Sequence, residues 1–297
     1  MNHRGDTTRK GIGKGFPSLK GACFILSFSA FFMFGTVLPP AGISQGVLWT
    51  RLEEGLALSE VASAPGSSVR DAKITLLKID PARYAFKLLS ASELGKVRMT
   101  AREWCKRYHL VSAINAGMYQ KDGLSNVGYM KNFTHLNNPR LNSSYKAVLC
   151  FNRVDPDVRE IQIADLRCND FEEIRHKYHT FVQNIRLISC RQENVWVKQE
   201  GRWSLAVLGV DREGNVLFIF SETPYSGHDF GNLLLSLPIS IFNAMYLEGG
   251  PEASLFLSTQ SMELDKTGLY DPGLNESVVR PGARRIPNVI GVVRKGE

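Results

Sequence analysis

An uncharged segment near the N-terminus divides the chain into two parts. No charged residue occurs between Gly21 and Thr50, and the stretch from Gly21 to Leu38 is almost continuously apolar. As a helix rising 1.5 Å per residue it would be about 27 Å long, close to the thickness of a bilayer core. Basic residues precede it and two prolines follow it. This order is typical of an export signal, so we expect residues 1–45 to be a basic tail followed by a cleaved signal peptide or a retained membrane anchor.

The net charge of +7 does not indicate a nucleic-acid-binding surface. Five Lys or Arg residues and one Asp stand in residues 1–20, so more than half of the excess charge belongs to the tail. The hydrophobic fraction of 43% excludes a disordered chain and is sufficient for a sizeable core. We therefore expect an exported protein, periplasmic or secreted, with no nucleic-acid partner. Contact with the inner membrane would be made through residues 21–38.

Export permits disulfide bonds, and four cysteines remain after the apolar segment: Cys105, Cys150, Cys168 and Cys190. Four cysteines allow three pairings, among which the sequence does not choose. Their spacings lack the Cys-x-x-Cys pairs of a zinc site. One or two structural disulfides are expected, with buried free thiols as the alternative, because a domain of this size needs no cross-link.

The sequence pattern of the rest of the chain predicts many strands with few helices between them. Asp80-Pro81 is a turn signal between two of these strands, which predicts a hairpin there. Thr100 and Glu103 form a capping box, which predicts a helix start. We predict strands at 73–79, 84–89, 111–117, 147–151, 182–188, 195–197, 205–210, 216–220 and 244–247, and helices at 100–108 and 231–237.

No regular alternation of strand and helix is present, so the pattern favours an α+β fold. We expect a single domain in which a mixed, largely antiparallel sheet is packed by a few helices, behind the N-terminal signal or anchor helix. Residues 46–72 are assigned to a leading strand and linker, and residues 73–297 to the domain itself.

Two strand ends carry polar residues next to glycines. The first is Asn115-Ala-Gly-Met-Tyr119 and the second is Leu247-Glu-Gly-Gly-Pro-Glu-Ala-Ser254. The pair Gly249-Gly250 can bring bare backbone N–H groups close to an anion, which would leave Glu248 as a carboxylate beside them. The alternative is a tight turn with a solvent-facing glutamate. Because each segment ends an apolar strand, we expect Asn115 and Glu248 to line one cleft.

Taken in order, these segments resemble the phosphodiester glycosidase family, in a divergent, bacterial-type branch. The resemblance rests on four blocks between about residues 70 and 295: Asn115–Tyr119, Val182–Ile188, Leu208–Gly214 and Leu247–Ser254. The sequence departs from the family pattern at Glu248, where an Asp is usual, and at Ala116 and Pro251, where glycines are usual. The resemblance implies the fold of that family, a glycan or sugar-phosphate substrate and no cofactor.

The chemistry of a sugar-1-phosphodiester suits these residues. The departing phosphate is a stable anion, so it needs less protonation than the alcohol of an ordinary glycoside. Glu248 is expected to act as base or nucleophile. His228 beside Asp229 is a candidate for proton transfer or for the cation near phosphate, with a capped helix start as the alternative. The expected substrate-binding residues are Asn115, Gly117, Tyr119, Gln183, Arg186, Gly249, Gly250 and Ser254, and no metal ligands are expected.

Three functions remain after this reading. The first is an exported hydrolase that cleaves a sugar-1-phosphodiester in an envelope or secreted glycan. The second is a non-catalytic glycan-binding or exopolysaccharide-assembly accessory protein on the same fold. The third, a metal-dependent phosphodiesterase, is disfavoured because no Asp/His cluster with metal-ligand spacing is evident in the sequence.

Overall fold

The computed structural model describes residues 47–62, 73–269 and 282–296, all within the compact unit Gln45–Glu297. The predicted signal or anchor segment lies outside the described residues, as does much of the predicted linker within 46–72. Among the described residues, no helix has the length and apolarity needed to cross a membrane.

The described residues form three sheets, in which every strand pair is antiparallel. The first sheet has the order β1 (Thr50–Glu53), β2 (Leu56–Ala62), β3 (Lys73–Ile79), β13 (Val216–Tyr225), β12 (Trp203–Asp211), β14 (Ile241–Gly249) and β11 (Arg186–Ile188). The second has the order β7 (His135–Asn138), β6 (Met130–Asn132), β10 (Tyr178–Asn184), β8 (Ala147–Arg153) and β9 (Ile161–Asp165). The third has the order β16 (Glu263–Thr267), β15 (Ser254–Ser258), β5 (Ser112–Asn115), β17 (Asn288–Arg294) and β4 (Tyr84–Ser90).

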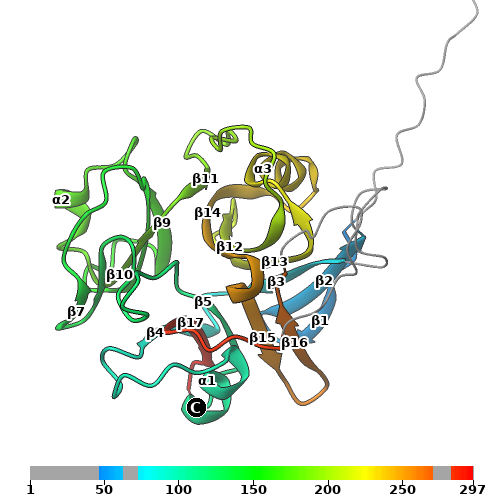
Figure 1. The fold of residues 1–297 in the computed structure, drawn as a ribbon, viewed down its shortest axis with the longest axis horizontal. Coiled ribbons are helices and arrows are strands. Elements are labelled where there is room, and N and C mark those ends of the chain that lie inside the picture. Colours follow the sequence, from blue (N-terminus) through cyan, green and yellow to red (C-terminus); the bar gives the residue numbers. More distant parts are fainter. Residues whose placement is uncertain (1–46, 63–72, 270–281, 297) are drawn as a thin grey trace, which may run out of the picture. The chain divides into compact units, whose positions relative to one another are not determined.

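Helices are few, as predicted (Figure 1). They are α1 (Ala101–Tyr108), α2 (Phe171–Ile174), α3 (Gly227–Ser236) and the single 3-10 turn η1 (Gly250–Glu252). Both hydrogen bonds of the capping box between Thr100 and Glu103 are present at the start of α1. Antiparallel sheet with few helices is thus confirmed, whereas the single mixed sheet is wrong, because the described strands divide into three sheets.

The three sheets share one apolar core, which explains how so few helices suffice. Phe86 of β4 lies edge-on to Phe151 of β8 and to Phe218 of β13, with ring centroids 6.5 and 6.4 Å apart. One residue of the third sheet therefore touches the second and the first. Sheets that bury their faces against each other leave little surface for helices to cover.

Strand β12 shows why the strands at the centre of the first sheet are apolar at successive positions of the sequence. Ala206 and Leu208 face the shared core, whereas Leu205 and Val207 face a second cluster that includes Phe230 of α3. Successive side chains of a strand point to opposite faces, so a strand buried on both sides needs apolar residues at every position. The hairpin of β12 and β13 forms as predicted, with Asp211 accepting hydrogen bonds from the turn backbone.

Two predicted features are wrong. The turn at Asp80 forms, but β3 pairs with β2 and β13 whereas β4 pairs with β17, so the two strands enter different sheets and make no hairpin. Residues 195–197 form no strand. Val197 is exposed there, and Trp196 packs on Tyr246 instead of joining a ladder.

Candidate active site

The strand end after β14 buries a carboxyl group. Only 8% of Glu248 is exposed, and its Oε1 accepts a hydrogen bond of 3.0 Å from the N–H of Gly249. Burial raises the pKa of Glu248 to about 8, since it penalises the charged form; the Gly249 bond opposes this shift and the nearby carboxylate of Glu252 adds to it. Glu248 therefore carries a proton over most of the neutral pH range.

Asn115 fixes the turn that contains Glu252. Its Nδ2 donates to the carbonyl oxygen of Glu252 at 2.9 Å, and its Oδ1 accepts from the N–H of Ser254 at 2.7 Å. The two glycine-flanked strand ends identified in the sequence therefore meet, because β5 pairs with β15 directly after this turn. The Ser254 hydroxyl also donates to the Glu252 carbonyl, at 3.1 Å, so both predicted binding residues stabilise the turn.

Tyr119 lies where charges of both signs converge. Its side chain is partly buried, which raises the pKa of the phenol, and the negative charges of Glu252 and Glu248, when these acids are ionised, raise it further. The guanidinium groups of Arg98 and Arg284 oppose that shift. Two carboxyl groups and two guanidinium groups thus influence the ionisation of Tyr119. Both arginines are exposed to solvent.

Gly117 permits a close approach behind this site. It has a φ of +123°, and a Cβ there would stand 2.7 Å from Oδ1 of Asn126 and 3.0 Å from Nδ2 of Asn184. The same Nδ2 of Asn184 donates to the carbonyl of Leu247 at 2.9 Å. Gly117 therefore lets Asn184 brace the backbone that leads into Glu248, and any larger residue would be strained and crowded.

Gln183, expected to bind substrate, supports the loops of the second sheet. Its Oε1 accepts from the N–H groups of Tyr129 and Asn142, at 2.9 and 2.8 Å. Its Nε2 donates to the carbonyls of Asn142 and Tyr145, at 3.0 and 2.8 Å. These four bonds use the whole capacity of the amide, so a ligand would have to displace one of them.

Gly249 and Gly250 have structural roles after β14, and their expected role in anion binding stays a prediction. The N–H of Gly249 is taken by Glu248, and a Cβ on Gly249 would overlap the indole of Trp203 and the hydroxyl of Tyr246. Gly250 has a φ of +64° and its carbonyl accepts from the N–H of Ala253. The glycines are needed here because aromatic side chains and a tight turn occupy the space.

His228 and Asp229 lie at the first turn of α3. Ser226 caps this helix by accepting from the N–H of Asp229 at 3.0 Å, and hydrogen bonding to Ser226 is the main cause that lowers the pKa of Asp229. His228 Nδ1 stands 3.5 Å from Asp229 Oδ1, a long and weak contact. Within the described part of the chain, no hydrogen bond or ion pair joins either residue to Glu248. The helix-start alternative fits these contacts.

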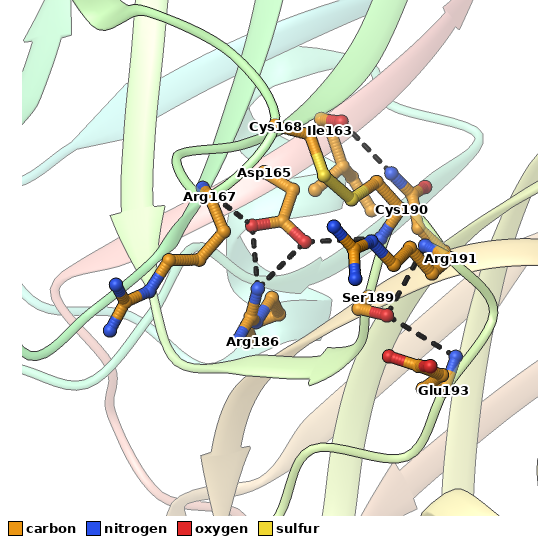
Figure 2. Close-up of a disulfide and its surroundings, with 10 residues drawn as sticks. Ile163, Asp165, Arg167, Cys168, Arg186, Ser189, Cys190, Arg191 and Glu193 are labelled. Atoms are coloured by element: carbon orange, nitrogen blue, oxygen red, sulfur yellow. Dashed lines mark hydrogen bonds and ion pairs between the residues drawn. A yellow bond between two sulfur atoms is a disulfide. The ribbon is translucent and has the colours of Figure 1, made fainter.

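Arg186 faces a different feature, the disulfide between Cys168 and Cys190 (Figure 2). Its Nη1 binds both carboxylate oxygens of buried Asp165, at 2.8 and 2.9 Å. The other cysteines of the described residues, Cys105 and Cys150, are buried free thiols. Asp165 and the two bonded sulfurs are the only group of three ligand-type side chains within metal-binding reach in the described residues, and a disulfide offers no thiolate to a metal.

Glu252, Arg98 and Arg284, whose charges act on Tyr119, are not among the residues predicted from the sequence. Glu252 could have been found, because a second carboxylate four residues after Glu248, across Gly-Gly-Pro, places two acids on one turn. Arg98 and Arg284 had no such signal, since both are far from Glu248 in the sequence and their charges act on Tyr119 only in the folded chain.

Comparisons with known proteins agree with this fold. The family model for phosphodiester glycosidase matches residues 108–293. The catalytic domain of zebrafish N-acetylglucosamine-1-phosphodiester alpha-N-acetylglucosaminidase, auto-inhibited by its pro-peptide, is similar with a TM-score of 0.55 and 16% identity over 80% of this chain and 81% of that chain. A hypothetical protein from Synechocystis is similar with a TM-score of 0.55 and 13% identity over 86% of this chain and 64% of that chain.

At these identities the solved structures establish a shared fold. A sequence search of curated proteins finds no match. The family model, however, spans well over half of the residues, including β5 with Asn115 and the turn with Glu248. The resemblance inferred from the sequence blocks is confirmed, and the chain belongs to the phosphodiester glycosidase family.

Proposed function

We propose that this protein is an exported hydrolase that cleaves a sugar-1-phosphodiester in an envelope or secreted glycan. The observation that carries the proposal is the buried carboxyl of Glu248, which lies at the end of β14, four residues before Glu252, and whose charge acts on Tyr119. Glycoside hydrolysis uses two carboxyl groups, and enzymes separate their roles by giving them different environments.

The two acids of this turn differ in their surroundings. Glu248 is buried and holds its proton near neutral pH, which suits a proton donor in place of the base or nucleophile expected from the sequence. Glu252 is partly exposed, so water can reach its carboxylate. In the proposed reaction Glu252 activates water or attacks the anomeric carbon, and Glu248 protonates or hydrogen-bonds the departing phosphate.

Arg98 and Arg284 are the nearby cations for that phosphate. Both lower the pKa of Tyr119, whereas the two glutamates raise it. A departing phosphate monoester keeps its negative charge, and preorganised guanidinium groups stabilise such a charge as it develops. The Cys168–Cys190 disulfide supports the exported location, because disulfides persist in oxidising compartments.

The test is turnover by the full-length protein of a series of sugar-1-phosphodiesters, beginning with an N-acetylglucosamine-1-phosphodiester. Release of free sugar is measured for wild type, Glu248→Gln, Glu252→Gln and the control Glu173→Gln, an exposed glutamate of α2. Each active-site variant should lose about 10²-fold or more in rate, which is about 3 kcal/mol in barrier, and the control should not.

Two further outcomes separate the alternatives. Glycan binding without turnover in wild type would favour the accessory function, and loss of turnover on adding a chelator would favour the metal-dependent phosphodiesterase. A rate that falls as pH rises through about 8 supports Glu248 as the proton donor, whereas a rate that rises there supports the base role.

A further inference from the structure

A cavity lined by three arginines lies beside the disulfide and is not used by the proposed reaction. Its volume is about 310 Å³, and Arg167, Arg186 and Arg191 line it together with both half-cystines and Glu193. Figure 2 shows the side chains of Arg167 and Arg191 on either side of the pair between Arg186 and Asp165. This volume is at the lower end for small-ligand sites.

The charge inside the cavity is only partly neutralised. Asp165 is buried and is satisfied by Arg186 and by the backbone N–H groups of Arg167 and Cys190. The Nε of Arg186 is buried and has no hydrogen-bond partner. Among the described residues, no side-chain hydrogen bond or ion pair engages the guanidinium of Arg167 or that of Arg191. Glu193 is the one acid among the described residues that line the cavity.

The disulfide fixes the two loops that carry these cations. Arg167 directly precedes Cys168 and Arg191 directly follows Cys190, so the cross-link joins the backbone next to both. Asp165 adds a second tie, since it accepts from N–H groups on each loop. The backbone positions of both arginines are thus fixed relative to each other before any ligand arrives, which lowers the entropic cost of ordering the loops on binding.

We propose that this cavity binds the phosphate group of a phosphorylated sugar, at a second site distinct from Glu248. Guanidinium groups match the oxygen geometry of phosphate and keep their charge at all physiological pH values. An unpaired buried donor on Arg186 and two unpaired cations among the lining residues suit an anion with several oxygens. The volume leaves room for part of an attached sugar. The proposal does not depend on catalysis at Glu248.

Calorimetric titration of the full-length protein with inorganic phosphate and with glucose 1-phosphate tests the proposal. Wild type should bind both saturably, and the double variant R167A/R191A should bind at least about tenfold more weakly, since two charge-assisted contacts are lost. Arg140→Ala, at an exposed arginine outside the cavity, should bind as wild type does. Glu193→Gln should bind more tightly, because it removes the acid at the wall.

Further variants locate the site and its source of phosphate. In Arg98→Ala, the binding that R167A/R191A removes should persist, whereas its loss would place that phosphate near Tyr119 and overturn the proposal. The double variant C168S/C190S, checked for folding by circular dichroism, should weaken binding because the loops are released. An unchanged affinity in R167A/R191A, or no saturation by wild type at about 10 mM, also overturns it. Binding to anionic lipid vesicles but not to glucose 1-phosphate would overturn the sugar-phosphate assignment.

Discussion

The buried carboxyl of Glu248 predicts a specific pH dependence of stability. Its pKa is about 8 in the folded protein against an ordinary value of 4.5. Between these values the folded state holds a proton that the unfolded state has lost, so the free energy of unfolding falls as pH rises, by about 1.4 kcal/mol per pH unit. The accumulated loss reaches about 5 kcal/mol above pH 8, comparable with the whole stability of many domains.

Glu248→Gln removes this effect while keeping the size of the side chain. The variant should match wild type near pH 4.5, exceed it by about 3 kcal/mol at pH 7 and by about 5 kcal/mol above pH 8. Urea unfolding of both proteins at several pH values between 5 and 9 measures the difference. The exposed Glu173→Gln serves as control and should show no such trend.

The shape of the difference curve decides the outcome. A difference that stays constant from pH 5 to 9 would refute the reasoning, because it would mean that Glu248 ionises equally in the folded and unfolded states. A difference that levels off near pH 6 would mean that water reaches the carboxyl and that burial raises its pKa less than the structure indicates.

Three other changes have expected outcomes. Removing the disulfide by C168S/C190S should lower the free energy of unfolding by about 3 kcal/mol, because the bond closes a loop of 22 residues; calorimetry with and without reductant checks this. Gly249→Ala should destabilise by about 1–3 kcal/mol, since the new methyl would overlap an indole ring, and a neutral result in urea unfolding would contradict that packing. Asn115→Ala should cost about 2 kcal/mol by leaving a buried backbone N–H unpaired, and Asn115→Asp, which keeps the acceptor but turns an oxygen toward the Glu252 carbonyl, should also destabilise in the same assay.

Features that depend on neighbouring residues could be predicted from the sequence. The capping box at Thr100 and Glu103 and the hairpin turn at Asp211 are complete within a few residues, and both form as expected. The pairing of β3 and β4 could not be predicted in this way. The turn between them is local, but their partners are chosen by burial against strands far along the chain, so the turn forms and the hairpin does not.

In the candidate site, too, the residues marked by local motifs could be predicted, whereas the properties that arise from distant packing could not. Asn115 and Glu248 stand out because glycines follow apolar strands, and the structure brings Asn115 onto the turn that follows Glu248. The high pKa of Glu248 arises from packing that no short motif encodes. Gln183 has the right chemistry for a ligand, yet the protein itself fills its hydrogen bonds. The roles assigned to these residues in catalysis and binding stay predictions.

Strand β17 has a consequence for how the protein is made. It is the last strand described, yet it lies in the third sheet between β5 and β4, with Val289 opposite Asn115. A ribosome that has passed Glu252 has already made both acids of the turn, but β5 and β4 still present unpaired backbone edges. Unpaired strand edges can pair with other chains. A stalled or shortened product that already contains both glutamates would therefore be prone to aggregate. Completion of β17 closes these edges and gives Asn115 its second neighbouring strand.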